Sequence, residues 1–112
     1  MTSQAKKQPS VVEEEERFDF NLSSPINSFG EMVSVLKWRR PNGADLIKVG
    51  NPIVFYPYLE PVKVEHDFVK VVQMMARLTG TPTSSLEKLD PEDIASFAWT
   101  ITPFFIPKMQ KT

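Results

Sequence analysis

The sequence predicts an α+β fold in which a small N-terminal β-hairpin or meander precedes a C-terminal bundle of three to four helices. Two observations support this prediction. Residues 17–22 and 32–39 alternate apolar and polar side chains, as half-buried strands do. Residues 64–101 instead repeat apolar side chains at helical spacing, and Gly and Pro interrupt that repeat.

The two N-terminal strands are separated by turn-forming residues. Ser23, Ser24 and Pro25 supply one turn, and residues 27–30 supply a second one that ends in glycine. Arg39-Arg40-Pro41 ends the second strand, because proline cannot donate a ladder hydrogen bond. The apolar side chains that share a strand face are Phe18, Phe20, Leu22, Met32, Leu36 and Trp38.

A short helix follows, beginning at Asn42 or Gly43 and ending at Gly50-Asn51-Pro52. It carries Asp45, whose carboxylate suits the first helical turn, and Leu46. Residues 51–63 hold three prolines among apolar side chains, so we expect an extended loop across the domain rather than a helix.

The longest helix is predicted over residues 64–79, with Glu65, His66 and Asp67 at its start. Arg77 lies in the last turn, where a cation is favoured, and Gly80 is the left-handed residue that ends the helix. The predicted core stripe consists of Phe68, Val71, Val72, Met75 and Leu78.

Two helices complete the predicted bundle. Thr83 or Ser84 caps a short helix that carries Leu86 and Leu89. Asp90 caps the last helix, Pro91 takes its first position, Glu92 and Asp93 occupy its first turn, and Pro103 ends it. Its apolar stripe consists of Ile94, Phe97, Ala98 and Ile101.

The 112 residues, 41% of them apolar, suit one domain. We expect a disordered acidic arm over residues 1–16, which contain four consecutive glutamates, because like charges repel and bury little. A single α+β domain then covers residues 17–103, and a flexible tail, apolar and then basic, covers residues 104–112.

Composition excludes several classes of function. The chain has no cysteine, which rules out disulfides and thiolate metal sites, and its net charge of −1 gives no electrostatic case for nucleic acid. No apolar run approaches the roughly 18 residues of a membrane span, and the N-terminal residues do not resemble a secretory signal, so we expect a cytoplasmic protein.

The residue types that carry chemistry are sparse. His66 is the one histidine, and we interpret it as a surface residue near a helix start rather than a base or zinc ligand. Of Arg39 and Arg40, we expect one to pair with Asp45 or Asp90 and the other to face solvent, although the pair could also bind phosphate. We predict no catalytic residue, no metal and no cofactor.

The aromatic residues suggest a binding surface. Trp99 lies off the apolar stripe of the last helix and could join the apolar residues of the tail. This group either packs into the core or forms a protein-binding patch, in which aromatic residues are enriched. The candidate partner-binding residues are Phe55, Tyr58, Trp99, Phe104, Phe105 and Ile106.

Several short motifs, taken in order, resemble the phage tail assembly chaperone family of Mu-like and related tailed phages. The resemblance covers about residues 18 to 100. The residues that carry it are Arg39, Arg40, Pro41, Asp45, Leu46, Arg77, Leu78, Thr79, Gly80, Pro82, Leu86, Leu89, Asp90, Pro91, Glu92 and Asp93.

The resemblance implies a non-enzymatic protein of the bacterial host cytoplasm that leaves before the virion matures. Such proteins bind the tape-measure protein, keep it soluble and help recruit tail tube subunits before the tube polymerises. The chain would be the short product of a gene that also makes a longer, frameshifted one. Self-association is left open. The alternative is a small regulatory or nucleic-acid-binding protein that uses Arg39, Arg40 and the basic tail.

Overall fold

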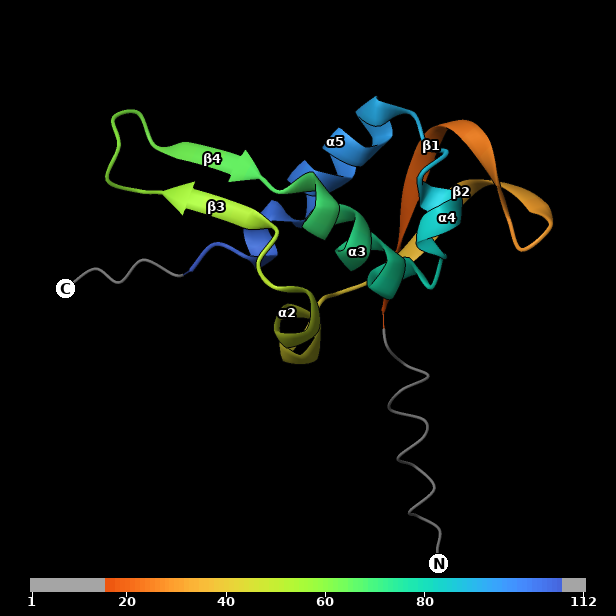
Figure 1. Ribbon diagram of the computed structural model, residues 1–112, viewed down its shortest axis with the longest axis horizontal. Coiled ribbons are helices and arrows are strands. Elements are labelled where there is room, and N and C mark those ends of the chain that lie inside the picture. Colours follow the sequence, from red (N-terminus) through yellow and green to blue (C-terminus); the bar gives the residue numbers. More distant parts are fainter. Residues whose placement is uncertain (1–15, 108–112) are drawn as a thin grey trace, which may run out of the picture.

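The computed structural model describes residues 16–107, which form two β-hairpins attached to a group of helices (Figure 1). This arrangement confirms the predicted α+β fold with an N-terminal hairpin. Except for Glu16, the predicted acidic arm lies outside the described residues, and so do residues 108–112 of the predicted tail.

The first hairpin pairs β1 (Arg17–Ser28) with β2 (Glu31–Arg39) in antiparallel register, so that Phe18 faces Trp38. The predicted turn at residues 27–30 is present at the tip of this hairpin. The turn expected at residues 23–25 is wrong, because β1 continues through it with a register shift between Asn21 and Ile26. A β-bulge of this kind absorbs extra residues and bends the strand instead of reversing it.

The short helix is α2 (Gly43–Val49), and it begins as predicted. The side chain of Asn42 accepts a hydrogen bond from the Asp45 N–H, while the Asp45 carboxylate accepts one from the Asn42 N–H. This reciprocal capping box satisfies two amides at the helix start. Gly50, with φ of 93°, follows the last turn.

The extended loop expected over residues 51–63 is instead a second hairpin. Strand β3 (Ile53–Tyr56) pairs antiparallel with β4 (Lys63–His66). The three prolines lie before β3 or between the two strands, where no ladder hydrogen bond is needed. In Figure 1 this hairpin extends to one side of the helices, and the β1–β2 tip projects to the other.

Helix α3 (Phe68–Thr79) starts later than predicted, because residues 63–66 belong to β4. The side chain of Asp67 caps it by accepting from the Lys70 N–H, and Gly80, at φ of 75°, ends it in the left-handed conformation as predicted. The core-facing stripe is rotated from the prediction, since Phe68 is 48% exposed and Met74 is fully buried.

Helices α4 (Thr83–Leu86) and α5 (Pro91–Ile101) complete the bundle, and a 3₁₀ turn over Thr102–Phe104 follows α5. Pro82, not Thr83 or Ser84, occupies the N-cap position of α4, and it makes no side-chain cap. The core lies where α3 and α5 pack against the first hairpin, and the Phe97 ring packs edge-on against Phe20 and Trp38.

Candidate functional site

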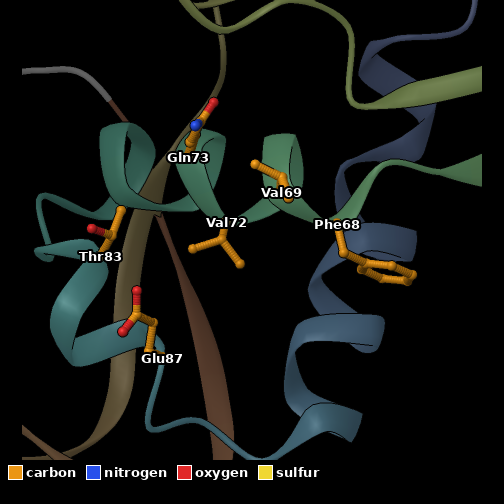
Figure 2. A pocket seen from close by; sticks show the side chains of 6 residues that line it. All are labelled: Phe68, Val69, Val72, Gln73, Thr83 and Glu87. Atoms are coloured by element: carbon orange, nitrogen blue, oxygen red, sulfur yellow. The ribbon is translucent and has the colours of Figure 1, made fainter.

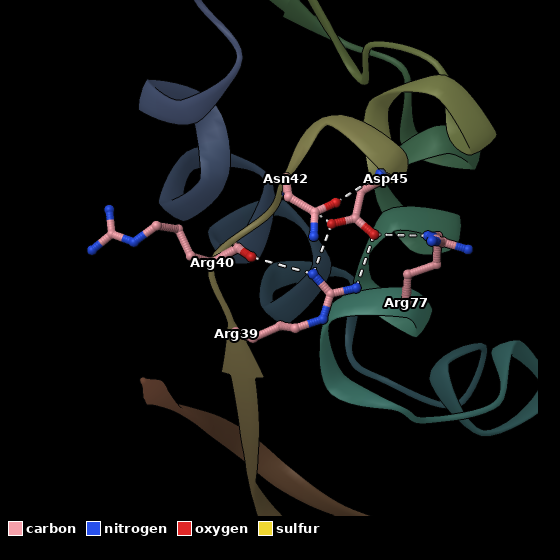
Figure 3. A network of polar contacts seen from close by, with 5 residues as sticks. All are labelled: Arg39, Arg40, Asn42, Asp45 and Arg77. Carbon is pink, nitrogen blue, oxygen red and sulfur yellow. Dashed lines mark hydrogen bonds and ion pairs between the residues drawn. The ribbon is translucent and has the colours of Figure 1, made fainter. Parts of the chain in front are cut away.

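Several charged residues of the motifs named above lie in two clusters, and the first cluster surrounds a buried carboxylate, that of Asp45. Arg39 donates two hydrogen bonds to Asp45, at 2.7 and 2.8 Å, and the Nε of Arg77 donates a third, at 2.9 Å (Figure 3). The Asp45 side chain is fully buried. The Arg39 guanidinium, helped by the Asn42 amide and Arg77, holds the pKa of Asp45 well below its usual range.

This network confirms that one arginine pairs with Asp45, and it adds Arg77, which the sequence placed only at a helix end. It ties the end of β2 and the last turn of α3 to the start of α2. Since the Asp45 carboxylate accepts hydrogen bonds from Arg39, Asn42 and Arg77 of the same chain, we assign it a structural role.

Arg40 points away from the network (Figure 3). Its guanidinium carbon lies 5.7 Å from the Phe18 ring centre and 5.4 Å from that of Phe104. A long ion pair of 3.7 Å joins it to Glu16, and both side chains are largely exposed. The two arginines therefore face different surroundings, so they do not form a paired phosphate clamp.

The second cluster lies at the start of α5, around Asp90 and Asp93. Asp90 occupies the N-cap position, but its carboxylate makes no cap hydrogen bond, which corrects the prediction. It accepts instead from the hydroxyls of Ser23, at 2.7 Å, and Ser24, at 3.2 Å. The buried carboxylate of Asp93 accepts from the Ser23 N–H, at 3.0 and 3.2 Å. The acids thus fasten the β1 bulge to the start of α5.

The candidate partner-binding residues come from several elements and differ in exposure. Phe55 is half-buried in β3, and Tyr58 is exposed in the turn that follows. Trp99 is 58% exposed on α5. Phe105 is buried, whereas Phe104 and Ile106 remain partly exposed beside it.

Trp99 lies beside the only histidine of the chain, His66 at the end of β4, and the two ring centres are 4.7 Å apart. The Nε2 atom of His66 is 2.9 Å from the Thr102 hydroxyl, which itself donates to the Ala98 carbonyl at 2.7 Å. Because the single hydroxyl proton is committed to that carbonyl, Nε2 carries a proton and donates. His66 lies next to the start of α3, as expected, but it is a half-buried link between β4 and α5 rather than a surface residue.

A hollow lies over α3 and α4, and we call it the helix groove. Its apolar floor is Phe68, Val69 and Val72, and its volume is about 400 Å³ (Figure 2). The polar side chains of Gln73, Thr83 and Glu87 line it as well. At Phe68 it adjoins a second hollow, which is lined by Pro91, Ile94 and Ala95 of α5.

Phe68 also lies beside His66, with ring centres 5.9 Å apart, so an aromatic row, Phe68–His66–Trp99, runs from the groove to Trp99 of α5. The sequence prediction missed the groove because it assigned Phe68 to the core, whereas Phe68 is 48% exposed. The available signal in the sequence was Val69, an apolar residue that lies outside the predicted core stripe and makes α3 apolar on more than one face. In the structure its side chain is 69% exposed.

A smaller pair of hollows lies beside α2, and we call it the α2 hollow. The two share Leu46, Phe104 and Phe105 as a common wall, and their volumes are about 280 and 290 Å³. The remaining lining residues are Pro41, Asn42, Gly43, Asn51, Ile106 and Pro107.

Exposed apolar surface of this kind marks an interaction site, for a protein partner, a membrane or a ligand. Among residues 16–107, no cluster of three or more His, Asp or Glu side chains could hold a metal ion. Within the same range, no helix is long and apolar enough to cross a membrane.

Comparison with protein families assigns the chain. Residues 19–106 match the family described as phage tail assembly chaperone proteins, E, or 41 or 14, and the chain belongs to this family. Membership confirms the resemblance and gives the protein a role as a chaperone of phage tail assembly. Comparisons with curated proteins and with solved structures gave no match.

Proposed function

We propose that the protein binds the phage tape-measure protein, keeps it soluble in the cytoplasm of the bacterial host and assists assembly of the tail tube around it. It acts without catalysis and leaves before the virion matures. Family membership supports the general role. The observation that carries the specific proposal is the helix groove and its aromatic continuation to Trp99.

An apolar groove between helices suits one face of an amphipathic helix, whose anchors repeat every three or four residues. Val69 and Trp99 are both more than half exposed, so the fold itself leaves much of their apolar surface in water. Covering that surface stabilises a complex by about 25 cal/mol per Å². A tape-measure protein, as a long helical chain, would offer many such apolar faces.

The groove is also suited to release. Its apolar floor is short, and Gln73, Thr83 and Glu87 bring polar groups to its lining. Small, partly polar contacts are typical of transient complexes. Several copies on one long client would then hold it by avidity, although each single contact is weak.

The other candidate residues have different places in this proposal. Tyr58 lies in the exposed β3–β4 turn with its ring against Tyr56, at 6.1 Å between ring centres, and we assign it an auxiliary client contact with Phe55. Phe104, Phe105 and Ile106 line the α2 hollow, which shares no lining residue with the helix groove.

The test is co-expression with the tape-measure protein, followed by measurement of its soluble fraction. Val69→Asp and Trp99→Ala each alter an exposed side chain of the proposed surface, so the chaperone should stay folded. We expect both variants to lower the soluble fraction of the client. Ile47→Asp is the matched control, because Ile47 is exposed on α2 away from the groove.

Two outcomes would contradict different parts of the proposal. A Val69→Asp variant that is folded and protects the client as well as the wild-type chain would show that the groove is not the binding site. A wild-type chain that leaves the client insoluble would reject the function itself.

A further inference from the structure

The tip of the first hairpin holds a strained aromatic residue. Phe29 has φ of 54°, and it is the one non-glycine residue of the described chain with positive φ. Gly30 follows at φ of 82°, and its N–H donates to the Asn27 side chain at 3.1 Å. Two successive left-handed residues form a type I′ turn, whose first position favours asparagine, aspartate or glycine and disfavours a bulky side chain.

Phe29 contributes little to its own fold. Its side chain is 79% exposed, and that of Met32, three residues further along the hairpin, is 65% exposed. A strained backbone that displays an apolar side chain to water is unfavourable on both counts. Such an outlier points to a contact outside the folded chain, in which the aromatic ring becomes buried.

The same molecule carries a surface that complements this tip. The α2 hollow has an apolar wall of Leu46, Phe104 and Phe105. Each of its two parts has a larger volume than the benzyl side chain of a phenylalanine. Arg40 lies beside it, over the Phe104 ring, and Glu31 lies beside Phe29 at the tip. The exposed Arg40–Glu16 pair is weak and exchangeable, so Arg40 is available to meet Glu31.

The contact must form between copies. The β1–β2 turn projects away from α2 in Figure 1, so a chain cannot place its tip in its own hollow. We propose that Phe29 and Glu31 of one copy dock in the α2 hollow of a second copy. The two surfaces differ, so the contact is heterologous and continues into an open row of copies. On the proposed function, such a row would follow a long client.

The first experiment measures self-association by sedimentation velocity over a range of concentrations, together with the melting temperature. Phe29→Asn places a residue that type I′ turns favour at the strained position. We expect the melting temperature to rise by about 4 °C or more, because the strain is relieved. We also expect self-association to weaken by about tenfold or more, as on loss of a central aromatic anchor. If Phe29 had only a structural role, its replacement would not raise the melting temperature and weaken self-association together.

The second experiment mixes two complementary variants. Leu46→Glu blocks the hollow but keeps the tip, and Phe29→Asn keeps the hollow. At a concentration where the wild-type chain associates, each variant alone should associate about tenfold or more weakly, and an equimolar mixture should form a dimer that grows no further. If Leu46→Glu fails to fold, Arg40→Glu replaces it, because Arg40 is exposed and outside the buried network. Tyr58→Asn, in the other hairpin, is the control and should associate like the wild-type chain.

Three results would overturn the inference: a wild-type chain that stays monomeric at every concentration, a Phe29→Asn variant that associates normally, or a mixture of folded variants that stays monomeric. A Phe29→Asn change that affects only client solubility would assign the tip to the client instead and would also reject the contact between copies. Because the measurements of self-association use no client, their failure is distinct from failure of the proposed function.

Discussion

The guanidinium of Arg39 and the carboxylate of Asp45 form a two-point ion pair, with hydrogen bonds of 2.7 and 2.8 Å, across the junction of β2 and α2. The carboxylate is fully buried, and Arg77 from α3 completes its coordination. Three elements thus depend on one acidic side chain.

Replacing Asp45 by Asn should lower the free energy of unfolding by about 3 kcal/mol, because it leaves two guanidinium groups without their charged partner at a buried site. Urea denaturation measures this change. Asp19→Asn is the matched control, since it breaks an exposed pair with Lys37 and should cost less than about 1 kcal/mol. Equal effects of the two substitutions would contradict the structural role of the network.

The same pair makes stability depend on pH. The pKa of Asp45 is lowered by Arg39 in the folded state, so its contribution is fully present above the unfolded value of about 3.9 and is lost as the pH falls toward the folded value. The difference in unfolding free energy between the wild-type chain and Asp45→Asn should therefore shrink steadily below about pH 4. Urea titrations at several pH values would show it, and a constant difference would argue against a lowered pKa.

Asp93 should also be important for stability, although it lies in a first helical turn where an acid is unremarkable in sequence. Its buried carboxylate satisfies the Ser23 N–H in the β1 bulge. Asp93→Ala should destabilise the fold by about 2 kcal/mol, because the Ser23 amide loses its acceptor. Ser24→Ala, which removes only the exposed hydrogen bond to Asp90, should change stability by less than about 0.5 kcal/mol. Thermal unfolding of both variants measures the two changes in stability, and an equal change in both would contradict the role of Asp93.

Gly80 ends α3 at φ of 75°, a conformation that a side chain disfavours. Gly80→Val should cost about 1 kcal/mol or more, as measured by chemical denaturation. Gly43 is the control: its φ is not positive and an added Cβ would meet no atom within 4 Å, so Gly43→Ala should be neutral or slightly stabilising. Unchanged stability of Gly80→Val would contradict the left-handed helix end.

His66 should titrate below the ordinary histidine value of 6.5, because burial lowers its pKa. Its neutral form is favoured in the fold, so this contribution to stability is present above the unfolded pKa and is lost as the pH falls through the folded one. A proton NMR titration is unambiguous, since the chain has one histidine. The urea-unfolded chain gives the reference, and a native midpoint at or above that reference would contradict the burial effect.

Local sequence signals predicted much of the framework. Alternation along residues 32–39 located β2, Asn42 and Gly50 bounded α2, and Gly80 marked the end of α3. The order of short motifs also predicted the family. These features succeed because strand alternation, capping and left-handed glycine depend on neighbouring residues alone.

Features that depend on long-range contacts were not predictable. The three prolines of residues 51–63 suggested a loop, but pairing between β3 and β4 is decided by residues about ten positions apart. Asp90 looked like a cap, yet its carboxylate bonds to serines 66 and 67 positions away. Periodicity also could not say which face of α3 the rest of the chain would cover.

The sequence by itself determined the α+β class, the order of most elements and the absence of any cysteine chemistry, because these follow from composition and local pattern. Only the tertiary structure decided which apolar side chains remain exposed. It buried Phe105, left Phe68 and Val69 open in the helix groove and placed Phe29 at a projecting tip. Exposure is the outcome of packing among distant segments, and candidate binding surfaces are defined by exposure.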